Sequence, residues 1–189
     1  MTKTKAISLF VFGILSLSVA YSQPEAVSAS LSKVIVDYSN QFPKYLGEPL
    51  TSNPQSEEFG SKICIVGAEQ CTITKYSAKS KTVYSWQARM PVSEDFSSAV
   101  KTYKELFQQA QQTVVTLGDK TFHLVGTYKE PTESLRFHSI ILTPDSKDRA
   151  LKNLKLEILL EADMLEWGIR VILYDKERLD DERGPVIEN

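Results

Sequence analysis

The two histidines are the residues whose type most directly suggests metal chemistry. His123 and His138 each follow a phenylalanine, on either side of the turn sequence Glu130-Pro131. A symmetric hairpin centred on this proline would place the two imidazoles directly opposite each other, about 5 Å apart. Zinc needs three or four converging ligands, so a carboxylate such as Glu157 or Glu161 would have to join them. The pattern indicates a metal-dependent hydrolase or metal-binding protein as one hypothesis, with two half-buried sheet histidines as the alternative.

The two cysteines have a spacing that suits a structural disulfide. Cys64 and Cys71 are separated by six residues that contain Gly67-Ala68. If these two residues form a hairpin turn with glycine first, Cys64 falls directly opposite Cys71, within bridging distance. A catalytic dithiol usually has the tighter C-x-x-C spacing at a helix N-terminus, which is not found here. The sequence therefore predicts a disulfide between Cys64 and Cys71.

Other catalytic and cofactor signatures are missing from the sequence. It contains no G-x-S-x-G, no P-loop, no G-x-G-x-x-G and no H-E-x-x-H, so no cofactor is expected. The formal net charge of −2 argues against nucleic acid as the main partner, because phosphate binding needs an excess of Lys and Arg. Tyr84 and Trp86 could stack against a sugar or a base, but aromatic residues at period two in a strand are more often core. An enzymatic function is not indicated.

The N-terminal segment predicts export. Residues 1–5 are basic, residues 6–20 are apolar, and small residues that suit signal peptidase follow. This is the pattern of a cleaved secretory signal peptide, which we place at 1–22. No later segment approaches the ~20 apolar residues of a membrane span, so no membrane anchor is expected in the mature chain. We predict a protein that is periplasmic or secreted.

The elements that must position these residues are organised around one hairpin near the C-terminus. Apolar and polar residues alternate over 154–162 and again over 167–174, as expected for half-buried strands. Pairing Ala162 with Trp167 sets Leu160 opposite Ile169 and places the whole apolar ladder on one face. A slip of one residue would expose that ladder, so this register is strongly favoured.

Two helices and further strands complete an α+β fold. Apolar residues at three- and four-residue steps predict helices over 24–41 and 93–112, with Ser93 as the N-cap of the second. Residues 44–61 show little periodicity and are expected to form a long loop. The remaining predicted strands are 62–66, 69–76, 82–90, 113–117, 120–127 and 134–143. We therefore expect one domain, 23–175, with an antiparallel sheet of about six or seven strands in the order α-βββ-α-β(β)ββ, followed by a disordered polar tail, 176–189.

The second face of the predicted hairpin carries the candidate binding residues. Leu159, Ile172 and Tyr174 lie on it among charged residues. A sheet with apolar residues on both faces is covered on both faces, either by one helix on each or by a partner on one. The predicted function is therefore binding. The expected partner is another protein, a second copy of the chain as a homodimer, or a small apolar ligand.

Overall fold

The computed structural model describes residues 26–77, 82–148 and 151–175. The predicted signal peptide, 1–22, and the predicted disordered tail, 176–189, fall outside these residues. The helices are α1 (Val27–Tyr38) and α2 (Phe96–Gln111). The strands are β1 (Leu46–Asn53), β2 (Ser56–Ser61), β3 (Gln70–Ser77), β4 (Thr82–Arg89), β5 (Val114–Leu117), β6 (Lys120–Val125), β7 (Phe137–Pro144), β8 (Leu154–Asp163) and β9 (Glu166–Asp175).

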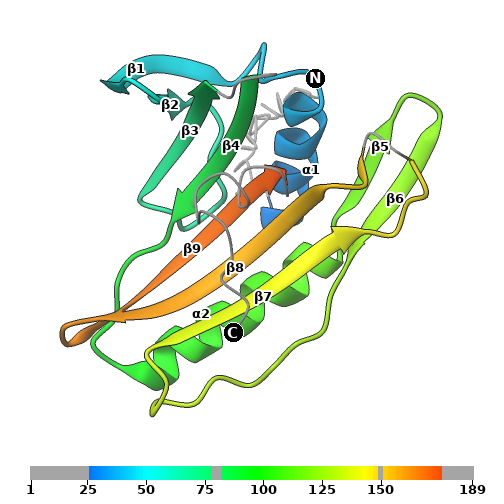
Figure 1. Ribbon diagram of the computed structural model, residues 1–189. Helices are drawn as coiled ribbons and strands as arrows, with labels where there is room; N and C mark the ends of the chain where they lie inside the picture. The colour runs from blue at the N-terminus through cyan, green and yellow to red at the C-terminus, as the bar shows by residue number, and fades with distance from the viewer. Residues whose placement is uncertain (1–25, 78–81, 149–150, 176–189) are drawn as a thin grey trace, which may run out of the picture.

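All nine described strands form one antiparallel sheet, in the order β1-β2-β3-β4-β9-β8-β7-β6-β5. The last strand therefore lies at the centre, between the two runs of strands that follow α1 and α2 (Figure 1). The predicted α+β class is confirmed, and the predicted number of strands is too low. The predicted register of the C-terminal hairpin is also confirmed, because Ala162 pairs with Trp167 and Leu160 pairs with Ile169.

Both helices pack on the same side of the sheet (Figure 1). Leu31 and Val34 of α1, Tyr103 of α2 and the ladder residues Ile158 and Val171 belong to one buried apolar cluster. The alternative with one helix on each face is therefore wrong. Since α1 and α2 are the helices of the described chain, neither is left to cover the second face.

The first hairpin, β1–β2, replaces the long loop predicted over 44–61. Its strands are mostly exposed or half-buried, so their residues do not alternate between apolar and polar, and the sequence pattern gives no strand signal. The two strands approach each other closely, because a Cβ on Gly47 would lie 2.3 Å from the carbonyl oxygen of Gly60. Glycine is required at position 47 for this contact.

The predicted disulfide joins Cys64 and Cys71, with their Cα atoms 5.5 Å apart. The predicted turn is wrong, however. The amide of Ala68 donates to the carbonyl of Ile65, so Val66 and Gly67 occupy the centre of the turn, and Gly67 has a φ of 84°. Residues 62–66 do not form the predicted strand. The bridge instead fastens an irregular loop to the first residues of β3.

The N-cap of helix α2 lies two residues later than predicted. The N-cap is Asp95, whose carboxylate accepts a hydrogen bond from the amide of Ser98 at 2.8 Å. Bonds from the Ser98 hydroxyl and amide also hold the pKa of Asp95 below its usual value. Ser93, the predicted cap, pairs with Trp167 of β9 in a β-bridge. The connection between β4 and α2 is thereby fastened to the C-terminal hairpin.

Alkaline pH should destabilise the fold through Tyr103, which is fully buried in α2. Burial, followed by the charges of Tyr128 and Glu157, raises the pKa of its phenol well above the usual value. An unfolded tyrosine releases its proton near pH ~10. The folded protein holds this proton to higher pH, so stability is complete below pH ~10 and falls as the pH rises above it. Urea unfolding at pH ~8 and pH ~11 measures how much the free energy of unfolding falls between the two pH values. The fall should be smaller for Tyr103→Phe than for the natural protein, and an equal fall in both would contradict this prediction.

Candidate functional site

The two histidines are not brought together. In the β6–β7 pairing Leu124 lies opposite Pro144, and the amide of Asp145 donates to the carbonyl of His123. His123 therefore lies opposite Asp145, which follows the end of β7 and is seven residues after His138. The prediction that the histidines face each other is wrong, because the β6–β7 connection is not symmetric about Glu130-Pro131.

His138 instead contacts that connection. Its Nε2 atom lies 2.9 Å from the carbonyl oxygen of Thr132. Nor do three or more His, Cys, Asp or Glu side chains of the described chain gather in a group that could hold a metal ion. The geometric argument for a shared histidine site is lost.

The two aromatic candidates on β4 have different environments. Trp86 is fully buried, and its indole N–H donates to the hydroxyl of Ser61 at 3.1 Å. This environment is that of a core residue. Tyr84 is half-buried and forms an edge-to-face contact with Phe42, with ring centroids 6.1 Å apart. Only Tyr84 reaches a surface pocket.

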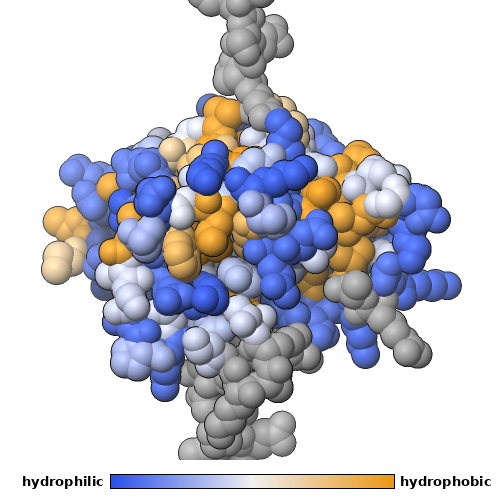
Figure 2. All heavy atoms as spheres, turned by 90° about the horizontal axis from the view of Figure 1, so that it is seen from above, coloured by the Kyte–Doolittle hydropathy of each residue, from blue (hydrophilic) through white to orange (hydrophobic). Residues whose placement is uncertain are grey.

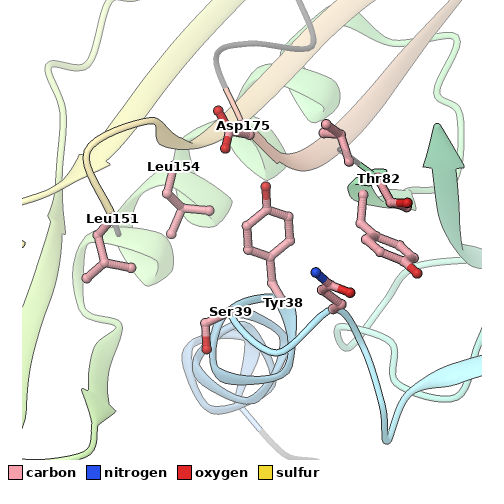
Figure 3. A pocket seen from close by; sticks show the side chains of 9 residues that line it. Tyr38, Ser39, Thr82, Leu151, Leu154 and Asp175 are labelled. Atoms are coloured by element: carbon pink, nitrogen blue, oxygen red, sulfur yellow. The ribbon is translucent and has the colours of Figure 1, made fainter. Parts of the chain in front are cut away.

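That pocket lies at the end of α1 and has a volume of about 250 Å³. Its walls come from α1, β4, β8 and β9, and Tyr38 stands at its centre with its ring pointing toward Asp175 (Figure 3). Leu151 and Leu154 lie on one side and Thr82 lies on the other (Figure 3). Tyr84 also lines the pocket. Small-molecule sites usually enclose ~300–1,000 Å³. The pocket is therefore small for a binding site.

The second face of the sheet offers less apolar surface than the sequence suggests. Leu159 and Tyr174 are buried, and Ile172 is half-buried. The carboxylate of Glu157 accepts hydrogen bonds from the Tyr174 hydroxyl, at 2.9 Å, and from the Ser139 hydroxyl. These candidate residues therefore present little area to a partner.

Among the described residues, five of the six large apolar side chains that are more than half exposed lie elsewhere, at the end of the sheet where β8 turns into β9; the sixth is Leu50 of β1. We call this group the apolar tip; it comprises Val92, Leu135, Phe137, Met164 and Leu165. Met164 and Leu165 are each 86% exposed, and the other three are more than half exposed. In Figure 2 hydrophobic residues reach the surface in separate places, and one such group projects at the left edge, the side of the β8–β9 turn in Figure 1.

Backbone pairing places the five residues around the same end of the sheet, on the turn and on both sides of the β8–β9 hairpin. Asp163 pairs with Glu166, so Met164 and Leu165 form the two-residue turn between β8 and β9. Pairing of Ser93 with Trp167 places Val92 beside Gly168 of β9, where a Cβ would lie 4.0 Å from Val92 Cγ1.

On the other side of the turn, the amide of Ala162 in β8 donates to the carbonyl of Arg136, at 2.9 Å. This bond holds Leu135 and Phe137 beside the end of β8. The sequence placed Met164 and Leu165 in a loop, and two apolar residues in a hairpin turn were the signal for the tip.

A hollow of about 340 Å³ lies beside the tip, between the β4–α2 connection and α2. Its lining includes Pro91, Val92, Ala99, Trp167 and Ile169. The ring of Trp167, which lines the hollow, also packs against Phe96 with centroids 4.7 Å apart. A concave apolar site next to exposed apolar side chains can receive one large side chain of a partner.

Negative charge surrounds the apolar tip. The segments 92–95, 133–137 and 163–166 contain five carboxylates, all on exposed residues, and a single cation, Arg136. These acids are Glu94, Asp95, Glu133, Asp163 and Glu166. Asp163 and Glu166 face each other across the hairpin, where like charges are unfavourable. A positively charged group placed over the tip would relieve that repulsion.

Comparisons with protein-family models, with curated proteins and with solved structures found no match to this chain. Among the described residues no helix is both long and apolar enough to span a membrane. The disulfide is compatible with an exported protein. Any functional conclusion therefore has to come from the site itself.

Proposed function

We propose that this is an exported binding protein that docks another protein through the apolar tip. The observation that carries the proposal is the exposure of Met164 and Leu165 at the end of the β8–β9 hairpin. A turn needs no large apolar residues, and water solvates such side chains poorly, so five of them in one place favour an interaction surface.

The backbone of the turn supports the same proposal. Met164 has a φ of 52°, a left-handed conformation that favours glycine at the first position of a two-residue hairpin turn. Holding another residue there costs roughly 1–2 kcal/mol. A strained conformation that presents an apolar side chain to solvent is a reason to suspect a binding role.

Charge indicates what kind of partner fits. Five carboxylates around the tip repel an anionic membrane surface and favour a protein that combines apolar and basic side chains. Export through the predicted signal peptide would place the protein among secreted or periplasmic partners. The histidine-dependent alternative has no comparable observation in its favour.

Site-specific photo-crosslinking in the exporting cell tests this proposal. A photoreactive amino acid at position 165 should give one discrete adduct, identified by mass spectrometry, and the same group at position 50 should not. Leu50 is a matched control because it is also exposed, at 53%, but lies on β1.

The partner identified in this way should then be purified and titrated. The variant Met164→Ser/Leu165→Ser should bind it about 10- to 100-fold more weakly, because the apolar area buried is lost. Leu50→Ser should bind normally. Equal adducts from positions 165 and 50, an adduct of the chain with itself, or normal binding by the double variant would each refute the proposal.

A further inference from the structure

The strand β7 leaves one edge open next to the apolar tip. It pairs with β8 from Phe137 to Leu142, but it pairs with β6 only near its end, at Thr143 and Pro144. The connection 126–136, which joins β6 to β7, runs past α2 (Figure 1). There Tyr128 contacts Phe107 with ring centroids 5.4 Å apart. The first part of β7 is therefore an edge within the sheet.

The register shows which backbone groups point to this edge. The amide of Ala162 donates to the carbonyl of Arg136, so even-numbered residues of β7 bond to β8. In an antiparallel ladder the alternate residues point their N–H and C=O groups away. These are Phe137, Ser139 and Ile141. Among the described residues no backbone hydrogen bond is found at their outward groups. Gly126 covers the carbonyl oxygen of Ile141, since a Cβ at position 126 would lie 2.8 Å from that oxygen, so the edge is open from Phe137 to the amide of Ile141.

The outer edges of the sheet differ from this one. Strand β5 has four residues, and β1 contains Pro49 and two irregularities in its pairing, features that hinder addition of another strand. The open part of β7 has no proline and carries Phe137 and Ile141, which are 56% and 41% exposed. Extended peptides bind such edges through main-chain hydrogen bonds, with alternate side chains in contact.

We infer that the partner adds an extended segment to the open edge of β7, as a further strand beside Phe137–Ile141. This rests on the proposed function and specifies how the partner binds. Apolar side chains of the added strand would contact Phe137 and Ile141. Basic side chains at its end near Phe137 would approach the carboxylates around the tip, including Glu133 and Asp163. The partner segment is therefore an alternating apolar and basic one.

Amide hydrogen exchange followed by NMR tests the edge directly. In the protein alone, the amides of Phe137, Ser139 and Ile141 should exchange roughly 100-fold or more faster than those of His138 and Ile140. A capped decapeptide of alternating valine and lysine should slow exchange at the three outward amides. Slow exchange at these amides in the protein alone would overturn the inference, because the edge would then be occupied.

Three matched controls separate strand addition from side-chain contact. The same peptide with all its backbone amides N-methylated keeps its side chains and should not bind, and a valine–glutamate decapeptide should bind at least ~10-fold more weakly. Vesicles of anionic lipid should not bind at all. Equal binding by the N-methylated peptide, or protection by the vesicles in place of the peptide, would overturn the inference.

Substitution of Ser139 completes the test. Ser139→Pro removes an N–H that points away from β8, so the β7–β8 ladder keeps its hydrogen bonds while the edge is blocked. Ser139→Ala loses the same hydroxyl contact to Glu157 but keeps the N–H, and it should bind the peptide normally. An equal loss of peptide binding in both variants would overturn strand addition. If these peptide tests fail while position 165 still gives a discrete adduct, strand addition at β7 would be refuted and the proposed function would stand.

Discussion

Replacing Trp86 with alanine should lower the free energy of unfolding by about 3–5 kcal/mol, the usual cost of removing a large buried aromatic side chain. Trp86 is fully buried and lies between Ile73 of β3 and Leu173 of β9 in the paired strands. Its loss would leave a cavity where the two runs of strands join. Chemical denaturation followed by circular dichroism would measure the change.

Two related variants show what the indole contributes. Trp86→Phe keeps most of the apolar volume but loses the bond to the Ser61 hydroxyl, so about 1–2 kcal/mol should be lost. Tyr84→Ala, at a half-buried position, should cost less than Trp86→Ala. If Trp86→Ala retained the natural stability, Trp86 would not be a core residue and a ligand-stacking role would return.

Sequence periodicity was informative where strands are buried on one face. The β8–β9 register follows from alternation over the hairpin, because a slip of one residue would expose residues such as Ile158 and Val171. The β1–β2 hairpin could not be found in this way, since exposed strands have no buried face to impose alternation. Its signals were the turn residues Asn53 and Pro54, which the sequence reading assigned to a loop.

The placement of the two histidines was wrong for a different reason, namely that it depends on connection geometry. Placing His123 opposite His138 required a symmetric loop, whereas the connection 126–136 runs beside α2 and shifts the β6–β7 pairing. The tip depends on Ser93 pairing with Trp167, a contact between distant segments. Periodicity is local and contains no information about such contacts, so the sequence shows only the two apolar turn residues, and the structure adds the other three residues of the tip.

Replacing Asp37 with alanine should cost about 2–4 kcal/mol, because a buried carboxylate that accepts backbone hydrogen bonds would be removed and its donors left unpaired. Asp37 is 3% exposed at the end of α1. It accepts from the amide of Tyr45 at 2.9 Å and from the amide of Lys44 at 3.2 Å. These bonds close the turn that leads from α1 into β1. Urea unfolding would give the loss, which should be smaller for Asp37→Asn because one oxygen remains.

The same turn permits a control that acts in the opposite direction. Gln41 and Phe42 have φ values of 65° and 57°, a left-handed conformation that costs a non-glycine residue roughly 1–2 kcal/mol. Phe42 is fully buried and cannot be replaced freely, but Gln41 is exposed. Gln41→Gly removes this cost, but glycine also gains conformational entropy in the unfolded chain, which favours unfolding. The net free energy of unfolding should therefore rise by up to about 1 kcal/mol. If Asp37→Ala lost little and Gln41→Gly gained nothing, the turn would not be held by the carboxylate, and the burial of Phe42 alone would have to maintain it.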